Sequence, residues 1–466
     1  MERLSIFDIF KIGVGPSSSH TLGPWKAAFE FARSLQNKNI DTVEINLYGS
    51  LSKTGKGHAT DIAVQLGLAG FRPETIDTEQ IADIVFKIRA DEQITINEQI
   101  IHFLPNQHIL FHPNAHAGHP NTLILKAFKD ENLVLATTYF SVGGGFIQEE
   151  GTSLANKAAI KLPFPIDKGA DLLAYTKREK VSISDIVLQN ELHFRPKKEI
   201  EGRIAHIFNT MLSCTFKGCY TDGILPGGLN VRRRAKALHG KLLVGEFLTT
   251  KTWLAAIKKS TADFNTINKW ISCFALAVNE ENAALGRVVT SPTNGAAGVI
   301  PAVLLYFLCF CENNGMRDIQ RFLFTAGEIG CLFKKGATIS AAVGGCQAEI
   351  GVSSAMAAGG LTEVLGGSPE QVLMAAEIAM EHHLGLTCDP IGGLVQIPCI
   401  ERNAMGAMKA ITASNLALYG NPENSVVKFD TVVKTMWDTA QDMNEKYKET
   451  SEGGLAFNLS VILPEC

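Results

Sequence analysis

The sequence lacks the marks of a membrane or secreted protein. Its longest strongly apolar run, residues 296–311, contains Pro301 and is shorter than the about 18–20 residues that a membrane-spanning helix needs. Met1-Glu2-Arg3 leads into a mixed segment without an apolar core, so we expect no signal peptide. Ten cysteines without such a signal indicate a reducing compartment, where thiols serve metals or packing. We therefore expect a soluble cytoplasmic protein.

A strong excess of charge is also missing. The 43 basic and 47 acidic residues give a formal net charge of −4, which is too small to imply a nucleic-acid or membrane partner. The 466 residues are 46% hydrophobic, so the chain can bury large cores. A length of this kind predicts roughly two to four domains. We expect a small-molecule substrate and a homodimer.

The two halves of the chain differ in hydrophobic pattern. Residues 43–48 alternate between apolar and polar, and residues 122–128 and 133–142 flank a short polar turn typical of a β-hairpin. From residue 199 onward, helical periods rich in Ala, Gly, Met and Leu dominate. The prediction is an α+β fold, divided into a mixed α+β domain over 1–150, a helical linker over 151–198 and an all-α domain over 199–466.

Two polar loops in the first half are candidate ligand sites. Residues 13–21 hold three serines and His20 directly before a helical segment, which suits a carboxylate or phosphate. The alternative is a polar loop with a capping serine. Residues 49–58 place Thr54, Lys56 and His58 among glycines without the spacing of a P-loop. A Lys or His held there could act as a general base, and a solvated turn is the alternative.

A third polar cluster, residues 290–298, opens the apolar helix expected from about Ala296. Thr293 and Asn294 stand there among small residues that expose backbone amides, which again suits an anionic group. The alternative is a simple helix cap. The three histidines between residues 112 and 119 could suggest zinc, but Pro113 and Gly118 break any regular helix face. We predict a polar surface loop for that segment.

Three cysteines stand in turns that contain glycine or proline. Cys346 follows two glycines, and Cys388 and Cys399 bracket a loop rich in Gly and Pro. Such turns bring the backbone close to a bulky object, as an iron–sulfur cluster requires. Cys388 and Cys399 are 11 positions apart and Cys346 lies 42 before them, unlike a tight C-x-x-C run. The alternative is that these thiols pack as small hydrophobes.

Taken together, the motifs resemble the iron–sulfur L-serine dehydratases of the single-chain bacterial type. The resemblance covers nearly the whole chain and rests on residues 15–21, 54–58, 141–146, 279–284, 292–298, 345–347 and 388–399. It implies an N-terminal domain similar to the allosteric substrate-binding domain of some phosphoglycerate dehydrogenases, followed by an all-helical catalytic domain. Val343, Gly344 and Ser291 depart from the family pattern, and none of them is a ligand.

The resemblance implies a lyase that converts L-serine to pyruvate and ammonia, in amino-acid catabolism and gluconeogenesis. It implies a 4Fe–4S cluster held by three cysteines, with one iron left open to act as a Lewis acid on the serine hydroxyl. Those ligands are Cys346, Cys388 and Cys399. The expected substrate-binding residues are Ser17, Ser19, Thr54, Thr293 and Asn294. The candidate proton acceptors are His20, Lys56 and His58.

The last residue, Cys466, is a further candidate ligand. The tail over residues 455–466 is nearly uncharged, so we expect it to pack against the body of the protein. An open iron site attracts a thiolate, so Cys466 is expected to cap the fourth iron position in the resting enzyme until serine displaces it. A chance terminal cysteine is the alternative.

Two other functions compete with this interpretation. A pyridoxal-phosphate lyase would need a Schiff-base lysine, Lys53 or Lys56, and a phosphate cradle at residues 143–145. That interpretation leaves three cysteines unexplained and lacks the alternating α/β pattern of such enzymes. A non-catalytic iron–sulfur or amino-acid sensor is the second competitor. An assay for pyruvate release distinguishes it from an enzyme.

Overall fold

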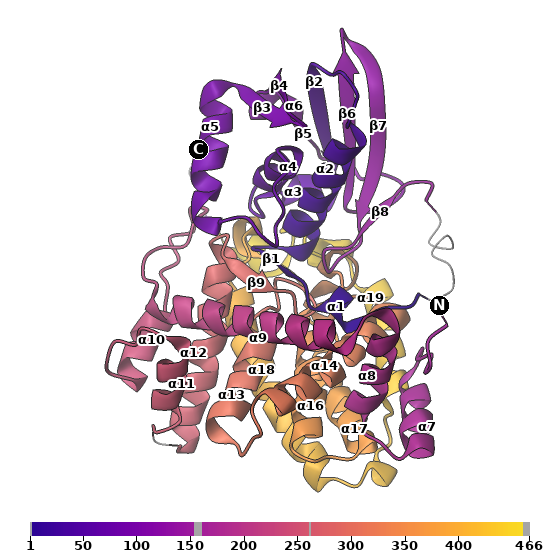
Figure 1. The fold of residues 1–466 in the computed structure, drawn as a ribbon, viewed down its shortest axis with the longest axis vertical. Helices are drawn as coiled ribbons and strands as arrows, with labels where there is room; N and C mark the ends of the chain where they lie inside the picture. Colours follow the sequence, from indigo (N-terminus) through magenta and orange to yellow (C-terminus); the bar gives the residue numbers. More distant parts are fainter. Residues whose placement is uncertain (1, 153–160, 261, 460–466) are drawn as a thin grey trace.

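The computed structural model describes residues 2–152, 161–260 and 262–459. Figure 1 shows a sheet-containing part above a larger helical part. The first 150 residues supply most of the sheet-containing part, and the later residues supply most of the helical part. The α+β fold predicted from the sequence is confirmed. Within the described ranges, no helix combines the length and the apolar character needed to cross a membrane.

The strands fall mostly in the first 149 residues. They are β1 (Ile12–Val14), β2 (Thr42–Tyr48), β3 (Gln93–Ile96), β4 (Gln99–His102), β5 (Ile109–His112), β6 (Thr122–Lys129), β7 (Asn132–Ser141), β8 (Ile147–Glu149) and β9 (Arg287–Val289). The helices before residue 190 are α1 (Ile6–Ile9), α2 (Gly23–Ser34), α3 (Ser50–Lys53), α4 (Thr60–Leu68), α5 (Ile81–Asp91), α6 (Pro105–His108), α7 (Gly169–Glu179) and α8 (Ile183–Phe194).

The later helices build the second part. They are α9 (Lys197–Tyr220), α10 (Ala235–Leu242), α11 (Thr250–Ile257), α12 (Phe264–Ala283), α13 (Val299–Phe310), α14 (Met316–Gly336), α15 (Ala341–Gly344), α16 (Ile350–Val364), α17 (Pro369–Glu381), α18 (Cys399–Tyr419), α19 (Phe429–Asp442) and α20 (Gly454–Asn458). Short turns of helix also matter below, namely η1 (Ser18–Leu22), η4 (Gly345–Ala348) and η5 (Ile391–Gly393).

A five-stranded sheet in the order β5-β2-β6-β7-β8 forms the first part. β2 pairs with β5 in parallel, and the other neighbours are antiparallel. The predicted hairpin is confirmed as β6 and β7, because Asp130 and Glu131 take the positive φ that a tight turn between twisted strands requires. Alternate strand residues such as Val43, Ile45 and Leu47 are buried beneath α2.

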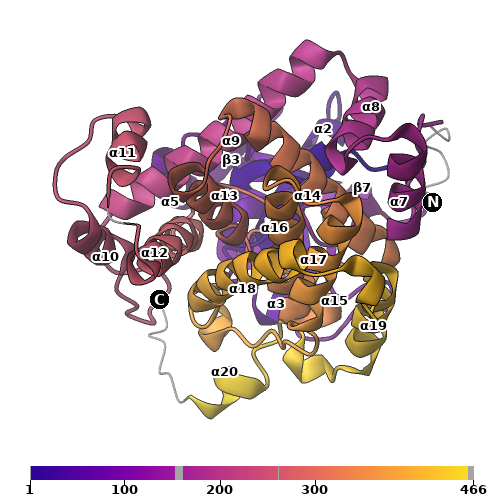
Figure 2. The same cartoon turned by 90° about the horizontal axis from the view of Figure 1, so that it is seen from below.

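Helix α16 lies at the centre of the second part. It contacts α13, α14, α17 and α18, and Figure 2 shows it among them. Its run of small residues allows this closeness: a side chain at Gly359 would come within 2.2 Å of Ile329, and one at Gly360 within 3.0 Å of the Phe322 carbonyl oxygen. In the segment predicted as a helical linker, Ser182 caps α8, because its hydroxyl accepts a hydrogen bond from the Asp185 amide.

The N-terminal residues belong physically to the helical part. α1 packs against α14, and β1 pairs antiparallel with β9, a short strand that the sequence pattern did not predict. The buried carboxylate of Glu191 accepts hydrogen bonds from the Ser5 hydroxyl at 2.8 Å and the Ile6 amide at 2.9 Å, and it pairs with Arg195. The first turn of the chain is thereby fixed before the sheet begins.

We expect Glu191→Ala to lower the free energy of unfolding by about 3–5 kcal/mol, because it leaves buried donors and the Arg195 charge without their acceptor. The urea midpoint measures the effect. Glu199→Ala is the control, because Glu199 contacts the same Arg195 through a half-exposed pair whose loss should cost less than about 1 kcal/mol. Equal midpoints for the two variants would contradict the anchoring role of Glu191.

Candidate active site

The three cysteines predicted as ligands are all buried at one end of the helical part. Cys346 lies in η4, Cys388 lies in the loop after α17, and Cys399 is the first residue of α18. The Sγ atoms of Cys346 and Cys388 and a carboxylate oxygen of Glu349 lie within 4.8 Å of one another. The glycine before Cys346 has φ +70°, and a side chain there would come within 2.8 Å of the Leu386 carbonyl oxygen. The turn therefore requires glycine.

Arg402 supplies a buried positive charge to the three thiols. Its guanidinium donates to Cys346 Sγ at 3.2 Å, to the Thr387 carbonyl at 2.8 Å and to Asp389 Oδ1 at 3.0 Å. A hydrogen bond from the Cys388 thiol and this guanidinium lower the pKa of Cys346, against the effect of burial. The same Cys346–Cys388 bond, with burial, raises the pKa of Cys388. Cys346 is the thiol best prepared to ionise.

The donor set fits a group that prefers soft ligands. Buried thiols select iron–sulfur clusters, zinc or copper(I) over hard cations, and a buried arginine balances the negative charge that thiolates bring. The other described cysteines differ. Cys219 and Cys273, for example, face each other at 3.8 Å inside the helical core, and burial raises the pKa of Cys219. They pack as small hydrophobes.

Two histidines lie across the site, in the sheet-containing part. His20 and His58 are buried and their rings stack with centroids 4.6 Å apart. His58 Nδ1 lies 2.8 Å from the Thr54 carbonyl oxygen, which only accepts, so Nδ1 carries the proton and Nε2 keeps its lone pair. Burial lowers the pKa of His58 to about 4 and holds the pKa of His20 well below its usual range. Both rings are neutral near pH 7.

Hydrogen bonds also fix the tautomer of His20. The Ser50 hydroxyl donates its proton to the Glu449 carbonyl oxygen at 2.8 Å, so it must accept from His20 Nε2 at 2.9 Å. His20 Nδ1 is then an acceptor, and the Ser19 hydroxyl lies 2.9 Å from it. His20 is engaged on both ring nitrogens, whereas His58 Nε2 is the available base.

The carboxyl group of Glu449 faces both rings. Its Oε1 lies 3.5 Å from His20 Nδ1 and 3.6 Å from His58 Nε2. Burial raises the pKa of Glu449 well above its usual range, and the nearby Glu349 adds to the shift. Glu449 Oε2 is buried and has no hydrogen-bond partner among the described residues. Two imidazoles and a carboxyl group thus form one buried cluster.

The histidines reach the cysteines because loops from the two parts touch. A side chain at Gly57 would come within 2.6 Å of the Gly393 carbonyl oxygen in η5, so the backbones are nearly in contact. The Glu449 amide donates to the Cys388 carbonyl oxygen at 2.9 Å, while its own carbonyl accepts from Ser50. The site lies at this junction.

Most of the other predicted site residues line the same junction. Ser17 and Ser19 are buried, with hydroxyl oxygens 3.2 Å apart, and the Ser17 hydroxyl accepts from the His20 amide at the start of η1. Thr54 is buried beside Gly393. Asn294 donates to the Val14 carbonyl at 3.1 Å, and Thr293 is buried next to Glu349, whose raised pKa it partly offsets.

One predicted residue that the structure describes is not brought into this group. Lys56 is exposed, with its ammonium 5.7 Å from the Phe111 ring centroid, so the geometry favours His58 as the base. Cys466 lies outside the described residues. The three histidines considered as zinc ligands lie in and beside a surface turn. His116 and His119 form an isolated bridge there, and His112 Nε2 lies 2.7 Å from Asn46 Oδ1.

Sequence reasoning missed Glu449, Arg402 and Ser50. Arg402 stands three positions after Cys399 at the start of a helix, a spacing that places it on the same face and could have been noticed. Ser50 lies inside the glycine-rich loop already singled out. Glu449 carried no local signal, since it sits in a polar segment, 50 positions after Cys399.

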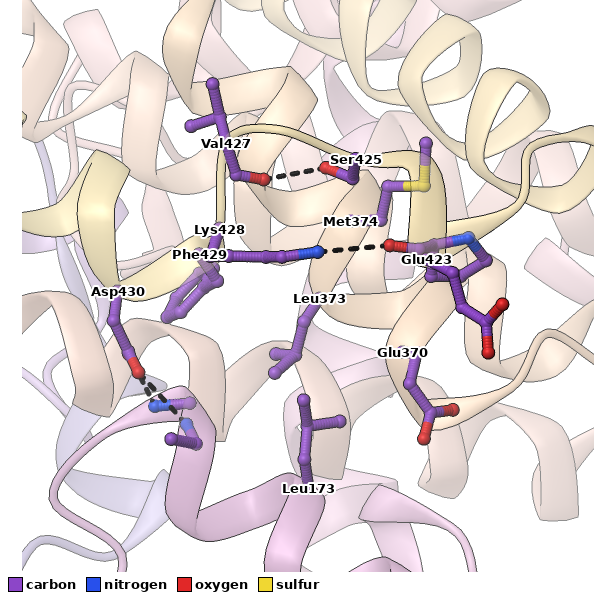
Figure 3. A pocket seen from close by; sticks show the side chains of 13 residues that line it. Leu173, Glu370, Leu373, Met374, Glu423, Ser425, Val427, Lys428, Phe429 and Asp430 are labelled. Carbon is purple, nitrogen blue, oxygen red and sulfur yellow. Dashed lines mark hydrogen bonds between the residues drawn. The ribbon is translucent and has the colours of Figure 1, made fainter.

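A separate apolar groove lies elsewhere on the helical part. Figure 3 shows Leu173, Leu373 and Phe429 facing it, with Asp430 accepting from the first amides of α7 at 2.7 and 3.0 Å. None of the predicted site residues lines it. It therefore belongs to the packing of α7 against α17 and α19, away from the thiols and imidazoles.

Two family models match this chain, one in each half. The family model for the serine dehydratase beta chain matches residues 5–152, and that for the serine dehydratase alpha chain matches residues 178–456. L-serine dehydratase 1 of Escherichia coli K12 is 45% identical over 98% of this chain and 99% of its own. The L-serine dehydratase of Streptomyces coelicolor is 47% identical over the same shares, and that of Helicobacter pylori is 43% identical over 98% and 100%. The chain belongs to the serine dehydratase family.

We expect Gly57→Ala to loosen the junction, because the added methyl group has no room beside the Gly393 carbonyl. Hydrogen exchange of the backbone amides should speed up in residues 50–60 and 390–397. Gly202→Ala is the control, because Gly202 lies in α9 with nothing within 4 Å of the added group. Unchanged exchange at both segments in Gly57→Ala would contradict the close contact.

Proposed function

We propose that this chain is an L-serine dehydratase, a lyase that releases pyruvate and ammonia from L-serine. The observation that carries the proposal is the pair of clusters at one junction: Cys346 and Cys388 with Glu349, and two buried neutral histidines with Glu449, the ligand atoms of each cluster lying within 4.8 Å of one another. The third buried cysteine, Cys399, lies near enough for its charge to act on Arg402. The family membership and relatives named L-serine dehydratase over the full chain length support the same activity. The homodimer, the cytoplasmic location and the role in gluconeogenesis stay predictions from the sequence.

Cys346, Cys388 and Cys399 would hold a 4Fe–4S cluster. The soft donor set and the Arg402 guanidinium beside the thiols support this assignment. When bound, such a cluster with an open iron position supplies a Lewis acid for the departure of the serine hydroxyl. Asp389 in turn holds Arg402 through a buried ion pair of 3.0 Å, so the cation stays beside the thiols.

His58 Nε2 would take the Cα proton. Its lone pair is fixed by the Nδ1 hydrogen bond to the Thr54 carbonyl, and its low pKa keeps the ring neutral. His20 holds Ser19 and Ser50 in place, and it is the alternative acceptor. Ser17, Ser19, Thr54, Thr293 and Asn294 stay the proposed residues for the substrate carboxylate, and all five are buried. The Thr293 hydroxyl supports this role most, because it has no hydrogen-bond partner among the described residues. The Thr54 hydroxyl donates to the Ser50 carbonyl and the Asn294 amide donates to Val14 and Asn282, so both would have to exchange a bond to reach the carboxylate.

The competing functions find less support. Lys53 pairs with Glu452 at 2.9 Å at the surface and Lys56 is exposed, so neither offers the enclosed amine of a pyridoxal-phosphate enzyme. A sensor would not need the available Nε2 lone pair of His58 beside a buried carboxyl group. Pyruvate release from L-serine separates the enzyme from the sensor.

We expect Cys388→Ser, purified without oxygen, to lose iron, sulfide and serine turnover together, because an alcohol is a poor ligand for a soft metal. Iron and sulfide counts beside a pyruvate assay make the measurement. Cys309→Ser is the control, because Cys309 is buried in α13 away from the site. Full iron and normal turnover in Cys388→Ser would contradict the ligand assignment.

The role of His58 predicts a particular pH dependence. Because burial lowers its pKa to about 4, the neutral, proton-accepting form persists as the pH falls, and protonation of His58 should cause no decline of kcat/KM above about pH 5. His58→Gln should lose about 10²-fold or more in kcat at unchanged iron content. The profile is measured from pH 5 to pH 9.

His383 provides the matched control for this test. It is also buried, its pKa is also lowered to about 4, and its Nδ1 donates to a carbonyl oxygen, that of Ala379, at 2.7 Å outside the site. His383→Gln should keep the parent kcat. An acidic decline centred at pH 6.5 or above that vanishes in His58→Gln would show an ordinary rather than a lowered pKa for the base.

A further inference from the structure

Free serine carries an ammonium group as well as a carboxylate and a hydroxyl, and each group needs a partner once it is buried. The junction described so far provides polar donors for the carboxylate and thiols on the side of the leaving group. A buried ammonium without an anionic acceptor is strongly unfavourable. Among the described residues, Glu349, Asp389 and Glu449 bring carboxyl groups to the junction. Asp389 already pairs with Arg402 and accepts from the Leu455 amide.

Glu349 lies on the cysteine side and already has neighbours. Its carboxylate is within 4.8 Å of the Cys346 and Cys388 thiols, and the Thr293 hydroxyl and the Arg402 charge both act to lower its pKa against burial. Glu449 lies on the histidine side. The groups that face it are neutral His20 and His58, the Ser19 hydroxyl, Glu349 and Cys346, so no cation balances it there.

We propose that Glu449 Oε2 accepts the α-ammonium group of the substrate and so selects amino acids over other hydroxy acids. The assignment rests on the proposed function. Oε2 is a buried oxygen without a hydrogen-bond partner among the described residues, although an oxygen so placed normally has one. An ammonium group supplies both the donor and the counter-charge that this oxygen lacks.

The position relative to the base supports the same assignment. Glu449 Oε1 lies 3.6 Å from His58 Nε2. A base acts within about 2.6–3.2 Å of the atom that carries the proton, or through one water. Here that atom is the substrate Cα, and the ammonium group is attached to the same carbon. A substrate whose Cα–H points to His58 therefore brings its nitrogen to the Glu449 carboxyl.

The backbone around Glu449 is built to hold the carboxyl group there. Glu449 has φ +59°, a left-handed conformation that is uncommon for a non-glycine residue and persists where surrounding contacts impose it. The contacts are the bonds to Cys388 and Ser50 already described. Beyond it, the Ser451 hydroxyl donates to the Pro390 carbonyl at 2.7 Å, and the Leu455 amide donates to Asp389 Oδ2 at 2.7 Å.

The test compares two ligands that differ only in the ammonium group. L-serine carries it, and 3-hydroxypropanoate has the same carboxylate and hydroxyl without it. In Glu449→Gln holoenzyme of normal iron and sulfide content, the KM for L-serine should rise at least about tenfold, the effect of removing one charged hydrogen-bond acceptor. The inhibition constant of 3-hydroxypropanoate should change less than about twofold, since it makes no bond to Oε2.

Two control variants separate this role from general loosening. Glu452→Gln removes a half-exposed carboxylate of the same segment that pairs with Lys53, and it should leave both constants unchanged. Glu349→Gln removes a second carboxylate of the junction and should not weaken the ligand with the ammonium selectively. The thermal unfolding midpoint of Glu449→Gln should match that of the parent.

Three results would overturn the proposal: a KM within twofold of the parent, equal weakening of both ligands, or a selective loss in Glu349→Gln instead. A parent holoenzyme that releases no pyruvate would refute the proposed function alone. Calorimetric titration with L-serine and 3-hydroxypropanoate, which needs no turnover, then decides the role of Glu449 by the same ratio of affinities.

Discussion

The site depends on the hydrogen bonds made by the backbone of Glu449. One side of this residue is bonded to Cys388 in the helical part and the other to Ser50 in the sheet-containing part. These two bonds help to fix the distance between the histidines and the thiols. The near contact of Gly57 with Gly393 holds the same junction from the other side. The chemistry therefore exists only when both parts are folded and docked.

Burial explains the electrostatic character of the junction. It lowers the pKa values of His20 and His58, so both rings are neutral around pH 7. It raises the pKa of Glu449, whose carboxyl group has no cation beside it among the described residues. The cysteine side is different, because Arg402 adds a fixed positive charge next to Cys346. The reaction is an elimination in which a proton and a hydroxyl leave neighbouring carbons. Neutral imidazoles on one side and thiols with a balancing cation on the other suit it.

Much of this arrangement could be predicted from local sequence. The β6–β7 hairpin and the Ser182 cap follow from alternation and turn chemistry, and the cysteine turns follow from their glycines and prolines. The choice between Lys56 and His58 could not, because they are two positions apart in one loop and only the docked structure buries one and exposes the other. Glu449 and the β1–β9 pair depend on contacts between residues far apart in the chain, for which no local pattern exists.

The central claim is that the buried thiols and the histidines act on one substrate at one junction. Mössbauer spectroscopy of the anaerobically purified protein, with and without L-serine, tests it most directly. The account predicts about four irons per chain, one of which changes its signal when L-serine is added while pyruvate forms. A protein that turns over L-serine at full rate without iron, or whose iron signals are indifferent to L-serine during turnover, would contradict it.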